Sequence, residues 1–307
     1  MKKVVSVSLG SASRDHKVYT EIYGHKICIE RVGTDGDIEK MVEIIRELDG
    51  KIDAFGLGGM DLFLIVNGKK YVLRESEKII KHAKKTPIVD GSGLKGTLEK
   101  QTLRYLQANG FNFKDKKVLL VCALDRFGMA EELLRLGANT IYGDLMFSLG
   151  IPIKITSIKT LSKVANVALP VIRHLPFNML YPTGAKQEKS LEKYRKVFNW
   201  SEVIAGDFHF IKKYLPFNLT EKTIITNTVT SKDVEILASR GLKTLVTTTP
   251  ELNGRSFGTN VMESVLIALN EPNQKLDYED MLKKVDFKPR IISLDQVKRQ
   301  NRGLSHG

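Results

Sequence analysis

The chain of 307 residues has little cysteine and tryptophan and no long apolar run. Its two cysteines, Cys28 and Cys122, stand in apolar stretches and cannot form the disulfide framework of a small secreted domain. Neither a C-x-x-C nor an H-E-x-x-H pattern occurs. We therefore predict no structural or protease-type zinc site, and no metal.

The apolar stretches are too short and too interrupted for a membrane protein. The most apolar later stretch, 164–177, contains two prolines, an arginine and a histidine, and it is shorter than a membrane span. The N-terminal stretch 3–9 alternates valine with serine, which is typical of a strand rather than of a signal peptide. We expect a soluble cytoplasmic protein with no membrane partner.

The chain is strongly basic. Lysine and arginine total 48 against 35 acidic residues, which gives a formal net charge of +13. Such a charge suits nucleic acid, an anionic ligand or simple solvation. The basic residues are spread over several predicted helices and a C-terminal tail, and no nucleic-acid-binding motif accompanies them. We therefore predict no nucleic-acid partner.

The apolar pattern predicts an α/β protein of two domains. Residues 1–112 read as a small mixed α/β domain, with hairpins around Gly24 and around Asn67–Gly68. From residue 113, repeated strand–helix–strand units predict a Rossmann-like, doubly wound, parallel-sheet domain that extends to residue 307. A helical insertion at 151–200 either covers a cleft or forms a subunit contact, so a homodimer is one assembly that the sequence allows.

One stretch, clearest over residues 86–145, resembles a known family. Asp90–Gly91 follows an apolar strand, and a linking helix leads to a buried strand beginning at Lys117. This order is similar to the domain junction of the quinate/shikimate dehydrogenase superfamily, and Ser11-Ala12-Ser13 has the form of its S-x-S substrate motif. The chain resembles a quinate 5-dehydrogenase-like member, although the N-V-T-x-P-x-K motif of the family is absent. The resemblance implies an oxidoreductase that oxidises a small, anionic cyclic hydroxy acid, such as quinate or shikimate. It implies hydride transfer to NAD or NADP.

Two residues are predicted to be catalytic on this resemblance. Asp90, at a strand end, can bond a substrate hydroxyl and help a lysine to manage the proton that accompanies hydride loss. An Asp-Gly pair also fits a plain turn. For the lysine, Lys70 precedes Asp90 as the family order requires, and Lys95 follows it by five residues; we predict Lys70.

A substrate site is predicted at the end of the first strand. Ser11, Ser13 and Arg14 offer two hydroxyls and a guanidinium, which can hold a hydroxylated carboxylic acid. The same residues also suit a polar loop between a strand and a hairpin.

The predicted dinucleotide loop departs from the G-x-G-x-x-G fingerprint. Only Gly128 fits, and Asp125 stands where a carboxylate would repel pyrophosphate by about 4 kcal/mol at an effective dielectric of 20. Arg126 can pair with phosphate instead, and the following helix offers unpaired N–H groups. The predicted cofactor contacts in this loop are Ala123, Asp125, Arg126, Phe127 and Gly128.

Three further residues are predicted to contact the cofactor. Asp144 lies 16 positions after Gly128, at the end of the next strand, where an acid accepts hydrogen bonds from the ribose and favours NAD over NADP. Thr228 and Thr249 follow later strands and would line the nicotinamide side. Polar strand ends are also common without a ligand.

The unusual loop supports a second hypothesis. Because Asp125 occupies the loop and the lysine motif is absent, the chain also fits a non-catalytic, Rossmann-like metabolite-binding protein with a degenerate dinucleotide loop.

Overall fold

The computed structural model describes residues 1–174, 194–249, 251–252, 255–256, 258–271, 274, 276–285 and 287–294. The chain forms two compact α/β units, so the predicted fold class is confirmed. Unit 1 comprises Met1–Leu98, Ala165–Lys186 and Phe257–Phe287, and unit 2 comprises Glu99–Val164, Gln187–Ser256 and Lys288–Gly307. The units first divide between Leu98 and Glu99, inside a helix, whereas the sequence placed a boundary at residue 112.

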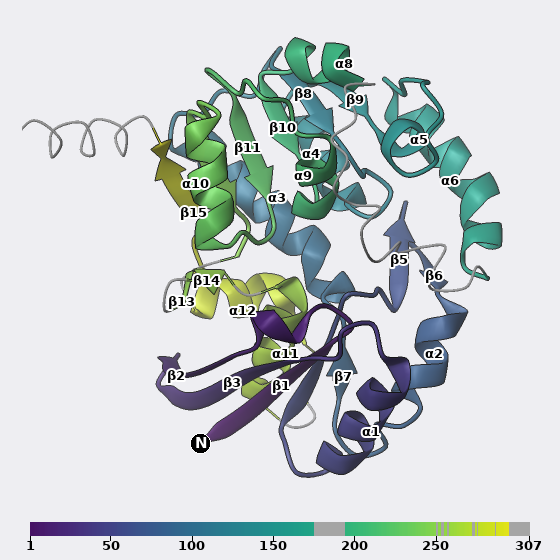
Figure 1. Cartoon of the computed structure of the whole chain (residues 1–307), viewed down its shortest axis with the longest axis vertical. Coiled ribbons are helices and arrows are strands. Elements are labelled where there is room, and N and C mark those ends of the chain that lie inside the picture. Colours follow the sequence, from purple (N-terminus) through teal and green to yellow (C-terminus); the bar gives the residue numbers. More distant parts are fainter. Residues whose placement is uncertain are drawn as a thin grey trace, which may run out of the picture. The chain divides into compact units, whose positions relative to one another are not determined.

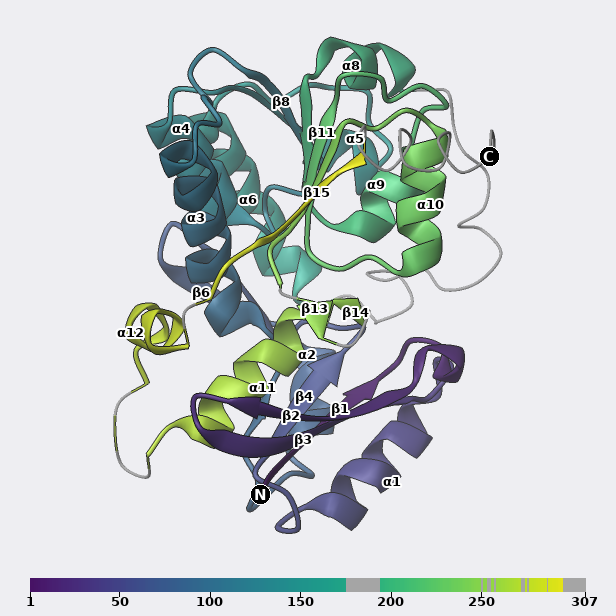
Figure 2. The same ribbon diagram turned by 90° about the vertical axis from the view of Figure 1, so that its left-hand side faces the viewer.

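The sheet of unit 1 has five strands in the order β2-β3-β1-β4-β7 (Figures 1 and 2). Four strands run parallel, and β2 lies antiparallel to β3 at one edge. The strands are β1 (Lys2–Ser8), β2 (His16–Ile22), β3 (His25–Gly33), β4 (Ala54–Gly58) and β7 (Ile88–Val89). The predicted first hairpin is confirmed: Tyr23 and Gly24 join β2 to β3 with φ angles of 52° and 73°, as a tight hairpin turn requires.

Helices cover both faces of this sheet because successive strand residues point to opposite sides. Val5 and Val7 of β1 pack with Met41 and Ile45 of α1, whereas Ser6 accepts a hydrogen bond from Asn260 of α11. The further elements of unit 1 are η1 (Ala12–Arg14), α1 (Ile38–Leu48), the hairpin β5 (Phe63–Val66) and β6 (Lys69–Val72), α2 (Arg74–Ile80), α11 (Thr259–Leu269) and α12 (Tyr278–Lys284). The β5–β6 pair confirms the second predicted hairpin.

The sheet of unit 2 has six strands in the order β15-β12-β11-β10-β8-β9. The strands are β8 (Lys117–Leu120), β9 (Asn139–Tyr142), β10 (Val203–Ala205), β11 (Thr223–Thr226), β12 (Thr244–Thr247) and β15 (Arg290–Ser293). Five run parallel, and β15 is antiparallel to β12. Read along the chain, the parallel strands follow the doubly wound order 2-1-3-4-5, whose switch point lies between β8 and β10.

The helices of unit 2 enclose a core rich in aromatic side chains. They are α4 (Phe127–Arg135), α5 (Asp144–Phe147), α8 (Arg195–Trp200), α9 (Phe208–Tyr214) and α10 (Ser231–Ser239), while α3 (Ser92–Ala108) and α6 (Ile158–Ile172) belong to both units along the chain. A short ribbon pairs β13 (Glu251–Leu252) with β14 (Arg255–Ser256). Phe147 contacts the rings of Tyr194, Phe198 and Tyr214 at centroid distances of 5.0, 5.7 and 5.0 Å. Of the predicted insertion at 151–200, residues 175–193 lie outside the described residues.

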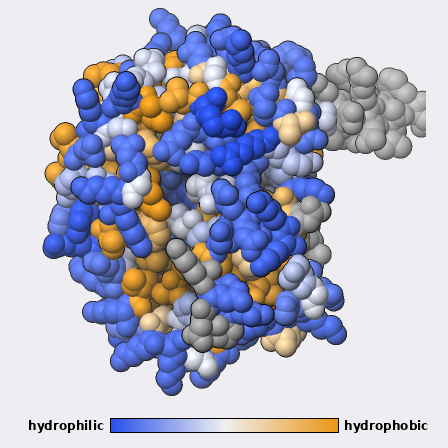
Figure 3. Space-filling model, turned by 180° about the vertical axis from the view of Figure 1, so that it is seen from behind, coloured by the Kyte–Doolittle hydropathy of each residue, from blue (hydrophilic) through white to orange (hydrophobic). Residues whose placement is uncertain are grey.

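The surface mixes polar and apolar residues. Figure 3 shows hydrophilic and hydrophobic residues interspersed over one face of the molecule. Within the described residues, no helix has both the length and the apolar character that a bilayer crossing requires. In the same part of the chain, histidine, cysteine and carboxylate side chains form no group of three or more that could hold a metal ion.

Candidate functional site

The candidate site lies at the carboxyl edge of the sheet of unit 2. Doubly wound sheets bind ligands at this edge, beside the switch point. Here the chain leaves β8 in a turn at 121–126 and leaves β10 at Gly206, and Asn227 directly follows β11. Asp207, after Gly206, caps α9 by accepting a hydrogen bond from the N–H of His209 at 2.8 Å.

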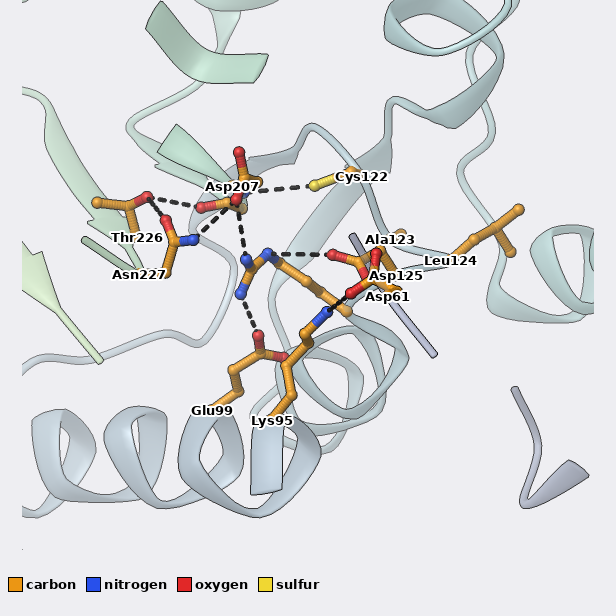
Figure 4. Close-up of polar contacts among 12 residues, drawn as sticks. Asp61, Lys95, Glu99, Cys122, Ala123, Leu124, Asp125, Asp207, Thr226 and Asn227 are labelled. Carbon is orange, nitrogen blue, oxygen red and sulfur yellow. Dashed lines mark hydrogen bonds and ion pairs between the residues drawn. The ribbon is translucent and has the colours of Figure 1, made fainter. Parts of the chain in front are cut away.

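Arg126 is the centre of this site. Its side chain is 3% exposed, and one terminal nitrogen donates a hydrogen bond to Glu99, whose side chain is 1% exposed. The other terminal nitrogen donates to Asp207 Oδ2 at 3.3 Å, and Nε lies 3.9 Å from Asp125 Oδ2 (Figure 4). Burial alone would lower the pKa of Arg126, but the surrounding carboxylates raise it well above its usual value. The guanidinium is therefore a buried, permanent cation that is held by three acids.

Asp207 is fixed by several groups besides Arg126. Asn227 Nδ2 donates to Asp207 Oδ2 at 2.8 Å, and the Asp207 N–H donates to Cys122 Sγ at 3.3 Å. Burial works against the charge of Asp207, but His209 and Arg126 hold its pKa below the ordinary value. Burial raises the pKa of the Cys122 thiol, so this cysteine is a neutral packing group. Asp207 therefore stays ionised at neutral pH.

Asp144 fixes the loop after β8. Its carboxylate accepts hydrogen bonds from the N–H groups of Ala123 at 3.1 Å and Leu124 at 2.8 Å. Burial raises the pKa of Asp144 to about 6, against the effect of these two hydrogen bonds. The N–H groups that a pyrophosphate would use are therefore paired with a carboxylate of the protein. Phe127 is buried and Gly128 is half-buried in the first turn of α4.

The two predicted threonines lie in the loops after β11 and β12. Thr249 is buried, and its hydroxyl donates to the carbonyl of Asn227 at 2.9 Å. Thr249 therefore ties the two loops together. Thr228 is half-buried beside Asn227. The structure thus brings the predicted loop residues and Thr249 to one sheet edge, and their contact with a cofactor stays a prediction.

Asp90 and Lys70, the predicted catalytic pair, both belong to unit 1. Asp90 is buried, and its carboxylate accepts hydrogen bonds from the Leu62 N–H at 2.6 Å and from the N–H and hydroxyl of Ser92. Lys70 is exposed on β6, and its Nζ lies 3.6 Å from the centre of the Phe63 ring. Within the described residues, neither a hydrogen bond nor an ion pair joins Lys70 to Asp90.

Lys95 and Glu263 form further polar contacts in unit 1. Lys95 Nζ lies 3.1 Å from Asp61 Oδ1. Glu263, which is 2% exposed, accepts hydrogen bonds from the Gly91 N–H at 2.6 Å and from the Tyr278 hydroxyl. Burial and the nearby Asp90 raise the pKa of Glu263 to about 7.

The predicted substrate residues form the turn after β1. Ser11 caps η1 and accepts a hydrogen bond from the Ser13 N–H at 3.2 Å, and the two hydroxyl oxygens lie 3.0 Å apart. Asp35 accepts the N–H of Ala12 at 2.9 Å. Both serines are exposed and Arg14 is half-buried. The serines therefore shape the turn, and their role in binding a substrate stays a prediction.

Three residues of these clusters were not predicted from the sequence. Glu263 was recognisable as unusual, because it is the one charged residue in the stretch 261–269, which is apolar except for Ser264. Asp207 also left a signal, since it follows a strand and a glycine. Glu99 stands in a polar stretch, where nothing in the sequence marks it as buried.

Fold and site define an α/β protein of two units with a buried, charged cluster at a switch point. The chain belongs to the family described as "Domain of unknown function (DUF8754)", whose family model matches residues 93–294. A second family model, "Domain of unknown function (DUF8753)", matches residues 3–90. No curated protein matches the chain in sequence.

Several solved structures are similar to the chain. An arabinose-binding protein from Geobacillus stearothermophilus is 9% identical, with 97% of this chain and 98% of that chain covered and a TM-score of 0.41. A galactofuranose-binding protein is 12% identical, with 97% of each chain covered and a TM-score of 0.37. A 5-methylthioribose transporter solute-binding protein from Thermotoga lettingae is 10% identical, with 97% and 88% covered and a TM-score of 0.36.

The prediction of an NAD- or NADP-dependent dehydrogenase that oxidises a small cyclic hydroxy acid, such as quinate or shikimate, is wrong. The three solved structures described above carry the names of binding proteins for arabinose, galactofuranose and 5-methylthioribose, not of oxidoreductases. The loop gives a physical reason, because Asp144 takes the N–H groups of Ala123 and Leu124 and Arg126 is committed to Glu99 and Asp207. Two parts of the prediction are not tested by these findings and stay predictions: the family resemblance over residues 86–145 and the binding of NAD or NADP.

Proposed function

We propose that the chain is a non-catalytic binding protein for a small, neutral, polyhydroxylated metabolite, held at the switch point of unit 2. One observation supports this most: three carboxylates surround a single guanidinium there. The side chains of Asp125 and Asp207 are 25% and 19% exposed, so both can also meet a ligand. The cytoplasmic location expected from the sequence is part of this proposal.

The charge of the cluster selects the ligand. With all four groups ionised, the cluster carries two more negative than positive charges. An anionic ligand at contact distance from one such carboxylate is opposed by about 4 kcal/mol at an effective dielectric of 20. The proposal therefore agrees with the sequence in a small-molecule partner, but it replaces the expected anionic hydroxy acid with a neutral ligand.

A hydroxylated ligand fits the donors and acceptors of the cluster. Each hydroxyl group both donates and accepts a hydrogen bond. The carboxylates of Asp125 and Asp207 accept hydrogen bonds, and the amide of Asn227, which gives one N–H to Asp207, has a second N–H to donate. Buried charges that are already fixed by one another need little reordering when a ligand arrives, which favours binding.

Isothermal titration calorimetry of the full chain tests the proposal. The probes are pentoses, hexoses and inositols, with NAD, NADP and quinate as the competing classes. We expect saturable binding of at least one neutral polyol with a dissociation constant near or below about 1 mM. Asp207→Asn should weaken that binding about tenfold or more, because a charge-assisted hydrogen bond is lost. Asp115→Asn, an exposed aspartate of unit 2, is the matched control and should bind as the wild type does.

Two results would overturn the proposal. One is the absence of polyol binding at millimolar concentrations while thermal unfolding shows that the chain is folded. The other is reduction of NAD that depends on added quinate or shikimate, because a non-catalytic protein cannot transfer hydride.

A further inference from the structure

Strand β2 is a long edge strand of the sheet of unit 1, and on its outer side it pairs with no other strand that the structure describes. It pairs with β3 on one side and stands at the end of the strand order (Figure 1). It has seven residues, whereas the other edge strands of the two large sheets that the structure describes, β7, β9 and β15, have two, four and four. Its sequence HKVYTEI contains neither proline nor glycine. Such an edge is a template for another strand.

The outer residues of β2 carry a self-complementary pattern. Lys17, Tyr19 and Glu21 are exposed and share one face of the strand, because side chains alternate. Tyr19 is 64% exposed. A lysine and a glutamate therefore stand two residues to either side of an exposed tyrosine.

The neighbouring strand continues this alternation of charge. In the β2–β3 register Lys17 lies opposite Glu30, with Nζ 3.1 Å from Oε2, and Glu21 lies opposite Lys26. Within one copy, each charge at the edge is thus backed by a charge of opposite sign on β3.

We propose that the β2 edge binds a second copy of this chain, with the two β2 strands antiparallel and the two-fold axis at Tyr19. This register places Lys17 opposite Glu21 of the second copy, and Glu21 opposite its Lys17. Four side chains then lie side by side across the joined sheets, and their charges alternate in sign. They are Glu30 and Lys17 of one copy, followed by Glu21 and Lys26 of the second copy. Opposite charges directly across a strand pair stabilise it, and like charges destabilise it.

The register follows from the charges. An axis at Val18 would place Asp15 opposite Glu21, which is a like-charge pair. An axis at Thr20 would place Glu21 opposite Tyr19 and leave no charge pair among these residues. A second copy presents the same lysine and glutamate in reverse order, as a two-fold interface requires.

The contact joins two five-stranded sheets into one of ten strands. One strand pair buries little surface, so we expect a dissociation constant in the range of tens to hundreds of micromolar. Because the paired charges are exposed, added salt should weaken the dimer.

Sedimentation velocity on the full chain tests the proposal with two charge reversals. Lys17→Glu and Glu21→Lys each turn both inter-copy pairs into like-charge pairs, so each variant alone should dimerise about tenfold more weakly than the wild type. An equimolar mixture of the two variants restores opposite charges at both pairs. The mixture should therefore recover dimers, which also shows that both variants are folded.

The controls make the same charge changes elsewhere. Lys232→Glu and Glu235→Lys alter exposed residues on α10 and should leave the dimer unchanged. A wild-type chain that stays monomeric up to about 1 mM would overturn the proposal. The proposal would also be overturned if both single variants dimerised as readily as the wild type. It would equally be overturned if the mixture of the two variants did not recover dimers.

Discussion

Replacing Arg126 by methionine should destabilise unit 2 severely. Methionine keeps much of the volume of the side chain but removes the cation from a site that is 3% exposed. Glu99, which is 1% exposed, then loses the guanidinium that balances its charge, and Asp207 loses one of its hydrogen-bond donors. Breaking a buried ion pair from one side costs about 3–5 kcal/mol. That is a large part of the 5–15 kcal/mol of a typical domain.

The double variant Glu99→Leu/Arg126→Met separates this cause from lost packing. Removing both partners leaves no unbalanced Glu99 carboxylate in the buried site, so the double variant should lose no more stability than Arg126→Met alone. The expected coupling is about 3 kcal/mol. Arg104→Met is the matched control: Arg104 is 47% exposed, and Arg135 also holds its partner Glu132. Its cost should stay below about 1 kcal/mol.

Tryptophan fluorescence during urea unfolding measures these effects. Trp200 is the only tryptophan of the chain and packs against the core of unit 2, so its emission reports on this unit. The reasoning would be refuted if Arg126→Met cost less than about 1 kcal/mol. It would also be refuted if the losses of the two single variants simply added in the double variant.

Three further predictions concern unit 1. Burial raises the pKa of Glu263 from 4.5 to about 7, so folding favours the protonated acid and the free energy of unfolding should fall as the pH rises through this window. Glu263→Gln should remove about 3 kcal/mol of this loss of stability, which urea titrations followed by circular dichroism at several pH values measure. If the free energy of unfolding fell with pH equally in the variant and in the wild type, the prediction would be contradicted. Gly91→Ala should lower the free energy of unfolding by about 2 kcal/mol or more, because Gly91 has φ +96° and a Cβ would lie 2.7 Å from Asn260 N. Gly110→Ala is the control and should lower it by only about 1 kcal/mol, because Gly110 has φ +91° but open space around it. Lys70→Ala should change the melting temperature little, because its exposed contact with a ring contributes at most about 1 kcal/mol.

Local structure was predictable because local residues determine it. Asn67 and Gly68 form the second hairpin turn with φ angles of 51° and 72°, which these two residue types adopt readily. The buried strand that begins at Lys117 was also recognisable, and it ends at Leu120. There the chain turns so that Ala123 and Leu124 can donate to Asp144.

The composition of the units was not predictable in the same way. Asn260 donates to Ser6 across 254 positions of sequence, and α11 thereby belongs to unit 1. The many apolar residues of α11 indicate that this helix is buried, but they do not indicate which sheet it packs against. Likewise, the position of Asp144 in the sequence indicates that it lies at a strand end. The direction of its carboxylate, however, depends on the conformation of the loop after β8.

The late position of α11 in the chain affects how the protein is made. The strands of unit 1 are complete at Val89, but the helix that covers β1 and β4 ends only at Leu269. At 5–20 residues per second, a ribosome needs about 10–40 s to synthesise the intervening residues. During that time one face of a finished sheet has no cover. The nascent chain should therefore depend on chaperones until α11 emerges, and fragments that end near residue 90 should aggregate.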